Sequence, residues 1–110
     1  MYQQGDIVLI PYPYTDLSSA KRRPVVILSK DAINRDFFIV AKITSVLRSD
    51  GLSFLLKNTD LENPIPKTSE VRTNEVFTAH KSLIIKKFTK VIRLTMIALT
   101  ERVKDHITVP

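Results

Sequence analysis

Three consecutive cations stand directly before a proline and an aliphatic run: Lys21, Arg22 and Arg23 precede Pro24. The aliphatic run predicts a strand over residues 24–29 with both faces covered. A cation at the mouth of such a strand is held by the sheet and still meets solvent and ligand. The planar fork of arginine suits charge that develops on phosphoryl oxygens. Arg23 is therefore the leading candidate for a catalytic group, and a solvated loop cation is the alternative.

The sequence of 110 residues contains no recognisable motif for most other kinds of catalytic site or for a metal site. The chain has no cysteine, and its two histidines, His80 and His106, lie far apart without a carboxylate at metal-ligand spacing. Neither metal nor cofactor is therefore expected. One reaction needs no protein nucleophile: the ribose 2′-hydroxyl of RNA attacks the adjacent phosphate, assisted by a base, an acid and cations. If the protein is an enzyme, this reaction fits its residues.

The charge balance points to a polyanionic partner. The chain carries 17 Lys and Arg against 11 Asp and Glu, a formal net charge of +6. Such an excess favours nucleic acid or an acidic protein segment. The length predicts one domain, residues 1–110. Because we see no signal peptide, no apolar run of ~20 residues and no cysteine, we expect a cytoplasmic protein without a membrane partner.

Short apolar segments separated by turn signals predict a mainly β protein. Strands are expected over residues 6–10, 24–29, 37–45, 52–57, 68–73 and 75–78, with a further strand within 84–94. The segments on either side of Asn74 could also form one interrupted strand. Pro11 is expected to end the first strand, and residues 15–22 to form a polar loop.

Helix is expected in two places only. Residues 79–83 are typical of a single helical turn, which His80 could cap. Thr95 is expected to cap a C-terminal helix, in which Met96 and Leu99 recur at helical spacing. Five to seven short strands followed by one helix predict a small, strongly curved antiparallel sheet or barrel that the helix closes.

Four short motifs follow one another along the chain. Gly5–Leu9 opens it, Lys21–Leu28 contains Arg-Pro before an aliphatic run, Ala41–Ser45 ends in Ile-Thr-Ser, and Val71–Thr78 precedes a short turn. In this order and at these separations they resemble the MazF/PemK family of toxins from bacterial type II toxin–antitoxin modules. The C-terminal helix also resembles that of the family in place and type.

The resemblance implies a single domain, an SH3-like β-barrel with a C-terminal helix, that forms a homodimer. It implies a toxin that cleaves single-stranded RNA sequence-selectively, without metal or cofactor. The 2′-hydroxyl attack leaves a 2′,3′-cyclic phosphate and a 5′-hydroxyl. It also implies a cognate antitoxin whose flexible, acidic tail covers the RNA-binding groove.

The resemblance assigns four catalytic residues. Arg23 matches the principal catalytic cation and proton-transfer group, and Thr44 matches the threonine that hydrogen-bonds the scissile phosphate. Ser69 matches an assisting serine of some members, and Arg72 a second catalytic arginine of PemK-like members. Asn74 stands where those members carry an aspartate base, and an amide cannot act as a base.

Four further residues are expected to bind RNA: Lys21, Arg22, Tyr12 and Asn74. Lys21 and Arg22 share the predicted loop of Arg23 and would position phosphates, and Tyr12, with Tyr14, could stack on a base. These assignments have structural alternatives. Arg72 could pair with Glu70 or Glu75 on the sheet, and the tyrosines could cover the barrel edge.

Two other functions remain open from the sequence. A related fold occurs in the CcdB type of toxin, which binds DNA gyrase and cleaves nothing. That mode of action does not need the Arg-Pro and Ile-Thr motifs. The second alternative is a basic SH3-like module that binds nucleic acid without cleaving it.

Overall fold

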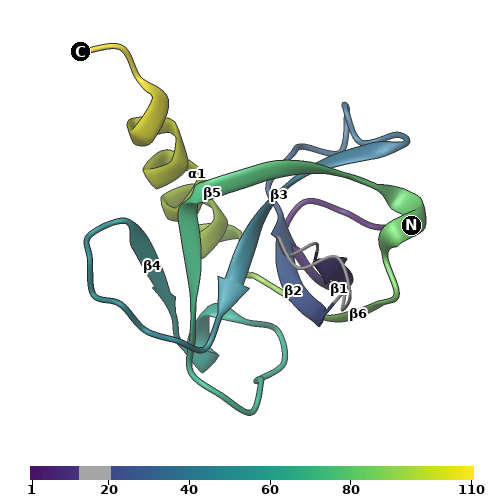
Figure 1. The fold of residues 1–110 in the computed structure, drawn as a ribbon, viewed down its shortest axis with the longest axis horizontal. Helices are drawn as coiled ribbons and strands as arrows, with labels where there is room; N and C mark the ends of the chain where they lie inside the picture. The colour runs from purple at the N-terminus through teal and green to yellow at the C-terminus, as the bar shows by residue number, and fades with distance from the viewer. Residues whose placement is uncertain (13–20) are drawn as a thin grey trace.

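An antiparallel sheet and a C-terminal helix make up the computed structural model, which describes residues 1–12 and 21–110 (Figure 1). The elements are β1 Asp6–Tyr12, β2 Lys21–Ile27, β3 Phe37–Thr44, β4 Ser53–Leu56, η1 Asn58–Asp60, β5 Ser69–His80, η2 Lys81–Leu83, β6 Lys86–Lys90 and α1 Arg93–Ile107. The six strands of the described part form one sheet in the order β4-β5-β3-β2-β1-β6. Every neighbouring pair is antiparallel. The prediction of a mainly β protein with a curved antiparallel sheet and a C-terminal helix is confirmed.

Strand β5 turns a corner that curls the sheet (Figure 1). Between the pairs Ala41–Val76 and Ile43–Val71, four residues of β5 stand opposite Lys42 alone. Extra residues on one strand bend it and increase its local twist. The sequence left open whether this segment forms two short strands or one interrupted strand. The structure has one strand of 12 residues, β5, whose pairing with β3 is irregular near Asn74.

The two edges of the sheet are joined by the segment that follows β4. Leu61 forms an isolated antiparallel bridge with Val91, just after β6. The Asn63 N–H donates to Thr89 Oγ1 at 3.0 Å, and the Thr89 hydroxyl donates to Asn63 O at 2.9 Å. These contacts cover the β6 edge and bring it to the β4 side, so the sheet curls into a half-barrel.

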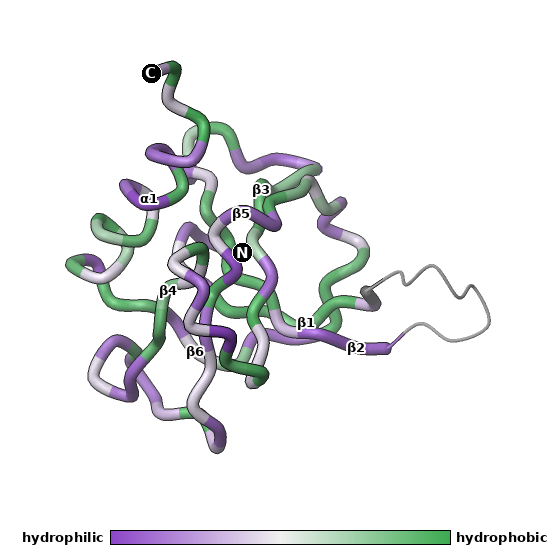
Figure 2. The backbone as a smooth tube through the Cα atoms, turned by 60° about the vertical axis from the view of Figure 1, so that its left-hand side comes forward, coloured by the Kyte–Doolittle hydropathy of each residue, from purple (hydrophilic) through white to green (hydrophobic). Residues whose placement is uncertain are grey.

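Both faces of the sheet carry apolar cores. Val25, Val26 and Ile27 of β2 are each 0% exposed, which confirms that both faces of this strand are covered. Val26 belongs to a cluster that includes Met96 and Leu99 of α1, whereas Val25 and Ile27 belong to a second cluster. Successive side chains of a strand point to opposite faces, so β2 separates the two clusters. Helix α1 accordingly alternates between hydrophobic and hydrophilic residues along its length (Figure 2).

Strands β1 and β2 extend further than the sequence predicted. β1 continues through Pro11 to Tyr12, which pair with Arg22 and Lys21 respectively. Lys21 and Arg22 are therefore strand residues, and the prediction that they belong to a polar loop is wrong. β6 pairs with β1 only as far as Leu9. Within the described residues one side of Pro11 thus lacks a strand partner, which is where a residue without an N–H is tolerated.

Helix α1 begins two residues before its predicted cap, Thr95. Ile92 occupies the N-cap position and makes no side-chain cap bond. The Thr95 hydroxyl instead donates to Asp60 Oδ1 at 2.8 Å, which ties the first turn of α1 to η1. Further along, His106 Nε2 lies 2.8 Å from Thr73 Oγ1 and holds α1 against β5. The helix start is therefore decided by tertiary contacts rather than by a capping side chain.

The short turn after β5 agrees with the sequence more closely. The helical turn predicted at 79–83 is present as η2, which spans Lys81–Leu83. Residues 79 and 80 belong to β5 instead. His80 caps η2, because its Nδ1 accepts a hydrogen bond from the Ser82 N–H at 3.1 Å. His80 thus has the capping role expected of it.

Candidate active site

Arg23, Thr44 and Ser69, three of the four residues expected to be catalytic, line one cavity of about 300 Å³. They come from three different strands, β2, β3 and β5. The remaining lining includes Lys67 from the loop before β5 and Phe88 from β6. Sequence positions that are far apart therefore converge on one hollow at the surface.

The antiparallel topology explains why these three side chains meet. Thr44 ends β3 and pairs with Glu70, the second residue of β5, so Ser69 starts its strand beside Thr44. Val25 of β2 pairs with Lys42 of β3. Continuing that antiparallel register by two residues brings Arg23 opposite Thr44. The start of β2, the end of β3 and the start of β5 thus lie at one end of the sheet.

The two hydroxyls of the cavity have defined hydrogen-bond partners. Thr44 Oγ1 accepts from the Val46 N–H at 3.1 Å, which leaves the hydroxyl hydrogen to be donated. The Ser69 hydroxyl donates to Lys67 O at 3.1 Å and thereby holds the loop that forms one wall. Ser69 is buried and Thr44 is half-buried. Thr44 is therefore oriented as a donor, and Ser69 is placed to shape the wall.

Two residues of the cavity were not singled out in the sequence. Lys67 is exposed and adds a second cation to the site of Arg23. Phe88 is 43% exposed, with the Lys86 Nζ 5.0 Å from its ring centroid. An aromatic side chain within the basic run 86–90 is the signal that could have revealed it, because stacking platforms and cations occur together in nucleic-acid sites. Lys67 carries no such signal, since only the fold brings it near Arg23.

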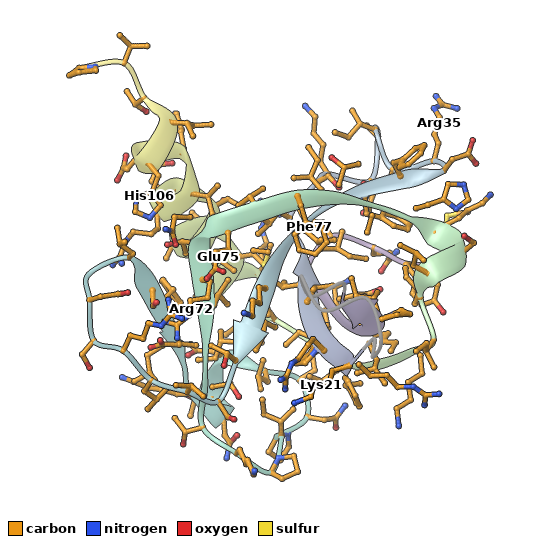
Figure 3. All side chains as sticks on the ribbon, in the orientation of Figure 1. Lys21, Arg35, Arg72, Glu75, Phe77 and His106 are labelled. Carbon is orange, nitrogen blue, oxygen red and sulfur yellow. The ribbon has the colours of Figure 1, made fainter. Side chains whose placement is uncertain are left out.

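Arg72, the fourth residue expected to be catalytic, does not line this cavity. Its side chain is 2% exposed and forms a buried ion pair with Glu70. Nη1 donates to Ser53 Oγ and Nη2 donates to Val46 O, each at 2.7 Å. Nε lies 3.7 Å from Glu75 Oε2, and Figure 3 shows these two side chains close together. Arg72 therefore pairs with Glu70 and Glu75, as the structural alternative expected. The catalytic role of Arg72 stays a prediction.

The residues expected to bind RNA are spread over the sheet. Lys21 and Arg22 are exposed on β2, next to Arg23, and Figure 3 labels Lys21, which begins that strand. Asn74 is exposed in the irregular part of β5 and is not a lining residue of the cavity. Tyr12 ends β1, and its side chain lies outside the described part, as does Tyr14 altogether.

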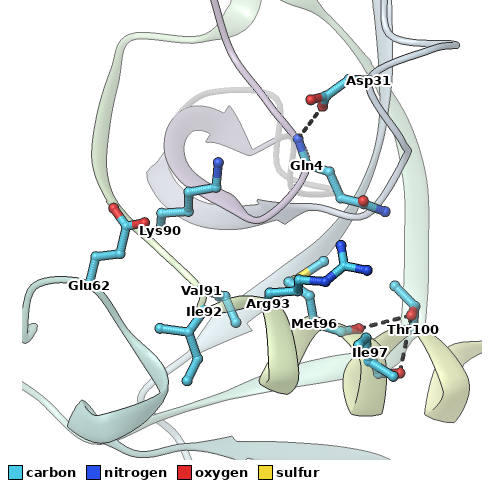
Figure 4. Close-up of a pocket in the computed structure, with 10 residues that line it drawn as sticks. All are labelled: Gln4, Asp31, Glu62, Lys90, Val91, Ile92, Arg93, Met96, Ile97 and Thr100. Carbon is cyan, nitrogen blue, oxygen red and sulfur yellow. Dashed lines mark hydrogen bonds between the residues drawn. The ribbon is translucent and has the colours of Figure 1, made fainter.

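A second cavity, of about 360 Å³, lies between the N-terminal segment, the end of β6 and the start of α1 (Figure 4). Its lining carries both signs of charge, with Asp31 and Glu62 against Lys90 and Arg93. No residue expected to be functional lines it. The first cavity is therefore the better candidate for an anionic ligand.

The described residues, 1–12 and 21–110, contain neither a candidate metal site nor a membrane-spanning helix. No group of three or more His, Cys, Asp or Glu side chains in these ranges could hold a metal ion. No helix in the same ranges is long and apolar enough to cross a membrane.

The described residues thus form a mainly β protein, a curled antiparallel sheet with a C-terminal helix and a cavity that Arg23, Thr44 and Ser69 line. Residues 3–107 match the family model of PemK-like, MazF-like toxins of type II toxin–antitoxin systems. The chain therefore belongs to this family and is the toxin of a toxin–antitoxin system.

Solved structures of other toxins share the fold at low sequence identity. One is an endoribonuclease in complex with its cognate antitoxin from a mycobacterial species: TM-score 0.78, 16% identity, all of both chains covered. The toxin MazF-mt6 of Mycobacterium tuberculosis gives 0.72 at 18% identity, covering 91% of this chain and 93% of the other. A MazE–MazF complex from Deinococcus radiodurans gives 0.78 at 13% identity, covering 96% and 95%. No curated protein sequence matches the chain.

Proposed function

We propose that this toxin is a metal-independent, sequence-selective endoribonuclease that cleaves single-stranded RNA. The observation that carries the proposal is the shared cavity of Arg23, Thr44 and Ser69. A cation and hydroxyls at one site suit the phosphoryl oxygens of RNA, whose own 2′-hydroxyl supplies the nucleophile. Family membership and a structural neighbour described as an endoribonuclease give further support.

In the proposed reaction the 2′-hydroxyl loses its proton and its oxygen bonds to phosphorus, while the bond from phosphorus to the 5′-oxygen breaks and that oxygen takes up a proton. The guanidinium of Arg23 stabilises the charge that develops on the non-bridging oxygens. The Thr44 hydroxyl donates to one of these oxygens, which its bond from Val46 N–H permits. Ser69 holds the wall formed by Lys67. The products carry a 2′,3′-cyclic phosphate and a 5′-hydroxyl.

The surroundings of the cavity suit a short stretch of single-stranded RNA. Phe88 offers a partly exposed ring on which a base can stack. Lys67 lies in the lining, and Lys21 and Arg22 are exposed next to Arg23, so all three can contact neighbouring phosphates. Asn74 stays a candidate for a contact outside the cavity, and Tyr12 stays a candidate whose side chain lies outside the described part.

We further propose a cognate antitoxin with a flexible acidic tail that competes with RNA for this basic surface. The net charge of +6 suits both ligands, and structural neighbours were solved in complex with their antitoxins. As in the family, the toxin would act in the cytoplasm as a homodimer of single-domain chains.

The deciding experiment is a map of RNA 5′ ends after incubation of a long RNA with the protein in EDTA. The proposal expects defined cuts that carry 5′-hydroxyls, and Arg23→Ala should abolish them. Arg35→Ala is the matched control, because Arg35 is an exposed cation away from the cavity. Intact RNA with trapped DNA gyrase would support the CcdB type of action instead. Salt-dependent binding without cleavage would support a plain binding module.

A further inference from the structure

Arg72 contacts the chain that follows the candidate catalytic threonine. Its Nη2 donates to the carbonyl of Val46 at 2.7 Å, and the N–H of the same Val46 donates to Thr44 Oγ1 at 3.1 Å. The buried guanidinium and the hydroxyl in the cavity are thus linked through a single residue. A shift of Val46 would turn the Thr44 hydroxyl.

Glu70 holds the same segment from its other side. Its Oε1 accepts from the Arg48 N–H at 3.0 Å and forms the buried ion pair with Arg72. Glu70 is also the residue that pairs with Thr44 across β3 and β5. Residues 44–48 are therefore fastened at Val46 and at Arg48 by one ion pair. In the next turn the Leu52 N–H donates to Asp50 Oδ1 at 3.0 Å, and this bond lowers the pKa of Asp50 from its usual value.

We propose that Arg72 is a positioning residue, which fixes the Thr44 hydroxyl through the peptide of Val46 without contacting RNA itself. The inference rests on the proposed function for its effect on cleavage. It assigns Arg72 a different role from the direct catalysis expected from the family resemblance. The guanidinium is 2% exposed, and its two Nη atoms donate to Glu70, Ser53 and Val46, whereas its buried Nε has no hydrogen-bond partner among the described residues.

The fork of arginine is needed for this task. Three acceptors at separate positions surround Arg72: the Glu70 carboxylate, the Ser53 hydroxyl and the Val46 carbonyl. A lysine keeps the positive charge, but its donors all lie on one ammonium group, so it cannot hydrogen-bond all three acceptors at once. Arg72→Lys therefore separates charge from geometry.

The first test is a double-mutant cycle with Arg72→Lys and Thr44→Ala, measured in single-turnover RNA cleavage. We expect Arg72→Lys alone to lower the maximal rate ~10- to 100-fold with little change in RNA affinity. In the Thr44→Ala background it should cause no further loss, because the hydroxyl that it positions is gone. Losses that multiply in the double variant would overturn the proposal, as would an unchanged rate for Arg72→Lys.

The matched control is Arg102→Lys. Arg102 donates to Ser53 O at 3.2 Å, so it touches the same β4 residue as Arg72 without touching Val46. Its cleavage rate should stay at the wild-type level. All rates are taken well below the unfolding temperature of each variant, so that lost stability does not enter the comparison. If Arg72→Lys does not fold, Glu70→Gln replaces it, because it weakens the ion pair and keeps an oxygen for the Arg48 N–H.

The second test does not depend on RNA. Amide hydrogen exchange of Val46 and Arg48 should be at least ~10-fold faster in Arg72→Lys than in the wild type, because local opening of this segment becomes easier. Amides of the central strands, such as Val26, should be unchanged. Unchanged exchange at Val46 would overturn the positioning role. A wild-type protein that cleaves no RNA would instead overturn the proposed function and leave the exchange result standing.

Discussion

Thr44 and Glu70 are paired residues of strands β3 and β5, so a hydroxyl of the candidate active site stands across from a buried carboxylate. Glu70 is 4% exposed and carries the ion pair with Arg72. Thr44 is half-buried and lines the cavity. Paired residues of antiparallel strands lie within ~5.5 Å of each other at Cα, so the charge network and the cavity share one strand pair.

Replacement of Arg23 by alanine should lower turnover strongly while the fold survives. We expect Arg23→Ala to lower RNA cleavage by about 10²–10³, because a donor to the developing phosphoryl charge is lost. Arg23→Lys should recover part of the rate, since it keeps the charge without the fork. Cleavage kinetics and circular dichroism together measure both effects. Wild-type turnover by Arg23→Ala would contradict the assignment.

The rate of RNA cleavage should depend on the hydroxyl of Thr44 more than on the volume of its side chain. Thr44→Val keeps the volume and removes the donor, so cleavage should fall by about 10² or more. Thr44→Ser keeps the hydroxyl and should stay within a few-fold of the wild type. RNA affinity, measured by fluorescence anisotropy, should change little in both. A similar rate for the two variants would show that the hydroxyl is not used.

Phe88 should contribute to RNA binding through stacking. Phe88→Ala should weaken the affinity for a short single-stranded RNA by about 1–3 kcal/mol. Phe88→Tyr, which keeps the ring, is the control and should bind as the wild type does. Binding is measured with the Arg23→Ala protein so that the RNA stays intact. Equal affinities for the alanine and tyrosine variants would exclude a stacking role.

Lys67 should contact a phosphate. The logarithm of the binding constant falls with the logarithm of salt concentration, and each neutralised phosphate of a single strand adds about 0.7 to that slope. Lys67→Ala should therefore lower the slope by about 0.7. Arg35→Ala removes the same charge outside the cavity and should leave the slope as it is. Equal slopes for Lys67→Ala and the wild type would argue against the contact.

Leu99 should be a main contributor to the stability of the helix–sheet core. It is 0% exposed in the cluster beneath α1, so Leu99→Ala should cost about 2–5 kcal/mol in the free energy of unfolding. Leu94, on the same helix, is 77% exposed, and its replacement by alanine should change stability by about 0.5 kcal/mol or less. Urea unfolding measures both values. A small effect at Leu99 would mean that α1 is not packed as described.

Local pattern in the sequence was sufficient for much of the architecture. The solid aliphatic run of residues 25–28 predicted a strand buried on both faces, and the alternation after residue 40 predicted β3. Both predictions rest on the hydrophobic periodicity of neighbouring residues, which is a local property of the sequence. The same signals placed Thr44 within the strand predicted over residues 37–45, whereas its assignment to the active site came from the family resemblance.

Other features were decided by pairing between distant segments. Lys21 and Arg22 read as loop residues, and the partner strand β1 draws them into the sheet. Thr95 is a residue type that commonly caps helices, yet its hydroxyl donates a hydrogen bond to Asp60 instead. Neither partner is near in sequence, so no local pattern reports it.

The sequence by itself determined that the chain is a mainly β, basic protein with Thr44 near a strand end, whereas it placed Arg23 at the start of a strand that in fact begins at Lys21. Only the tertiary structure decided that Arg23, Thr44 and Ser69 line one cavity while Arg72 is buried behind it. The physical reason is register. Which residue of β3 stands opposite which residue of β2 and β5 is set by long-range strand pairing, and it is this pairing that separates a group at the surface from a group in the core.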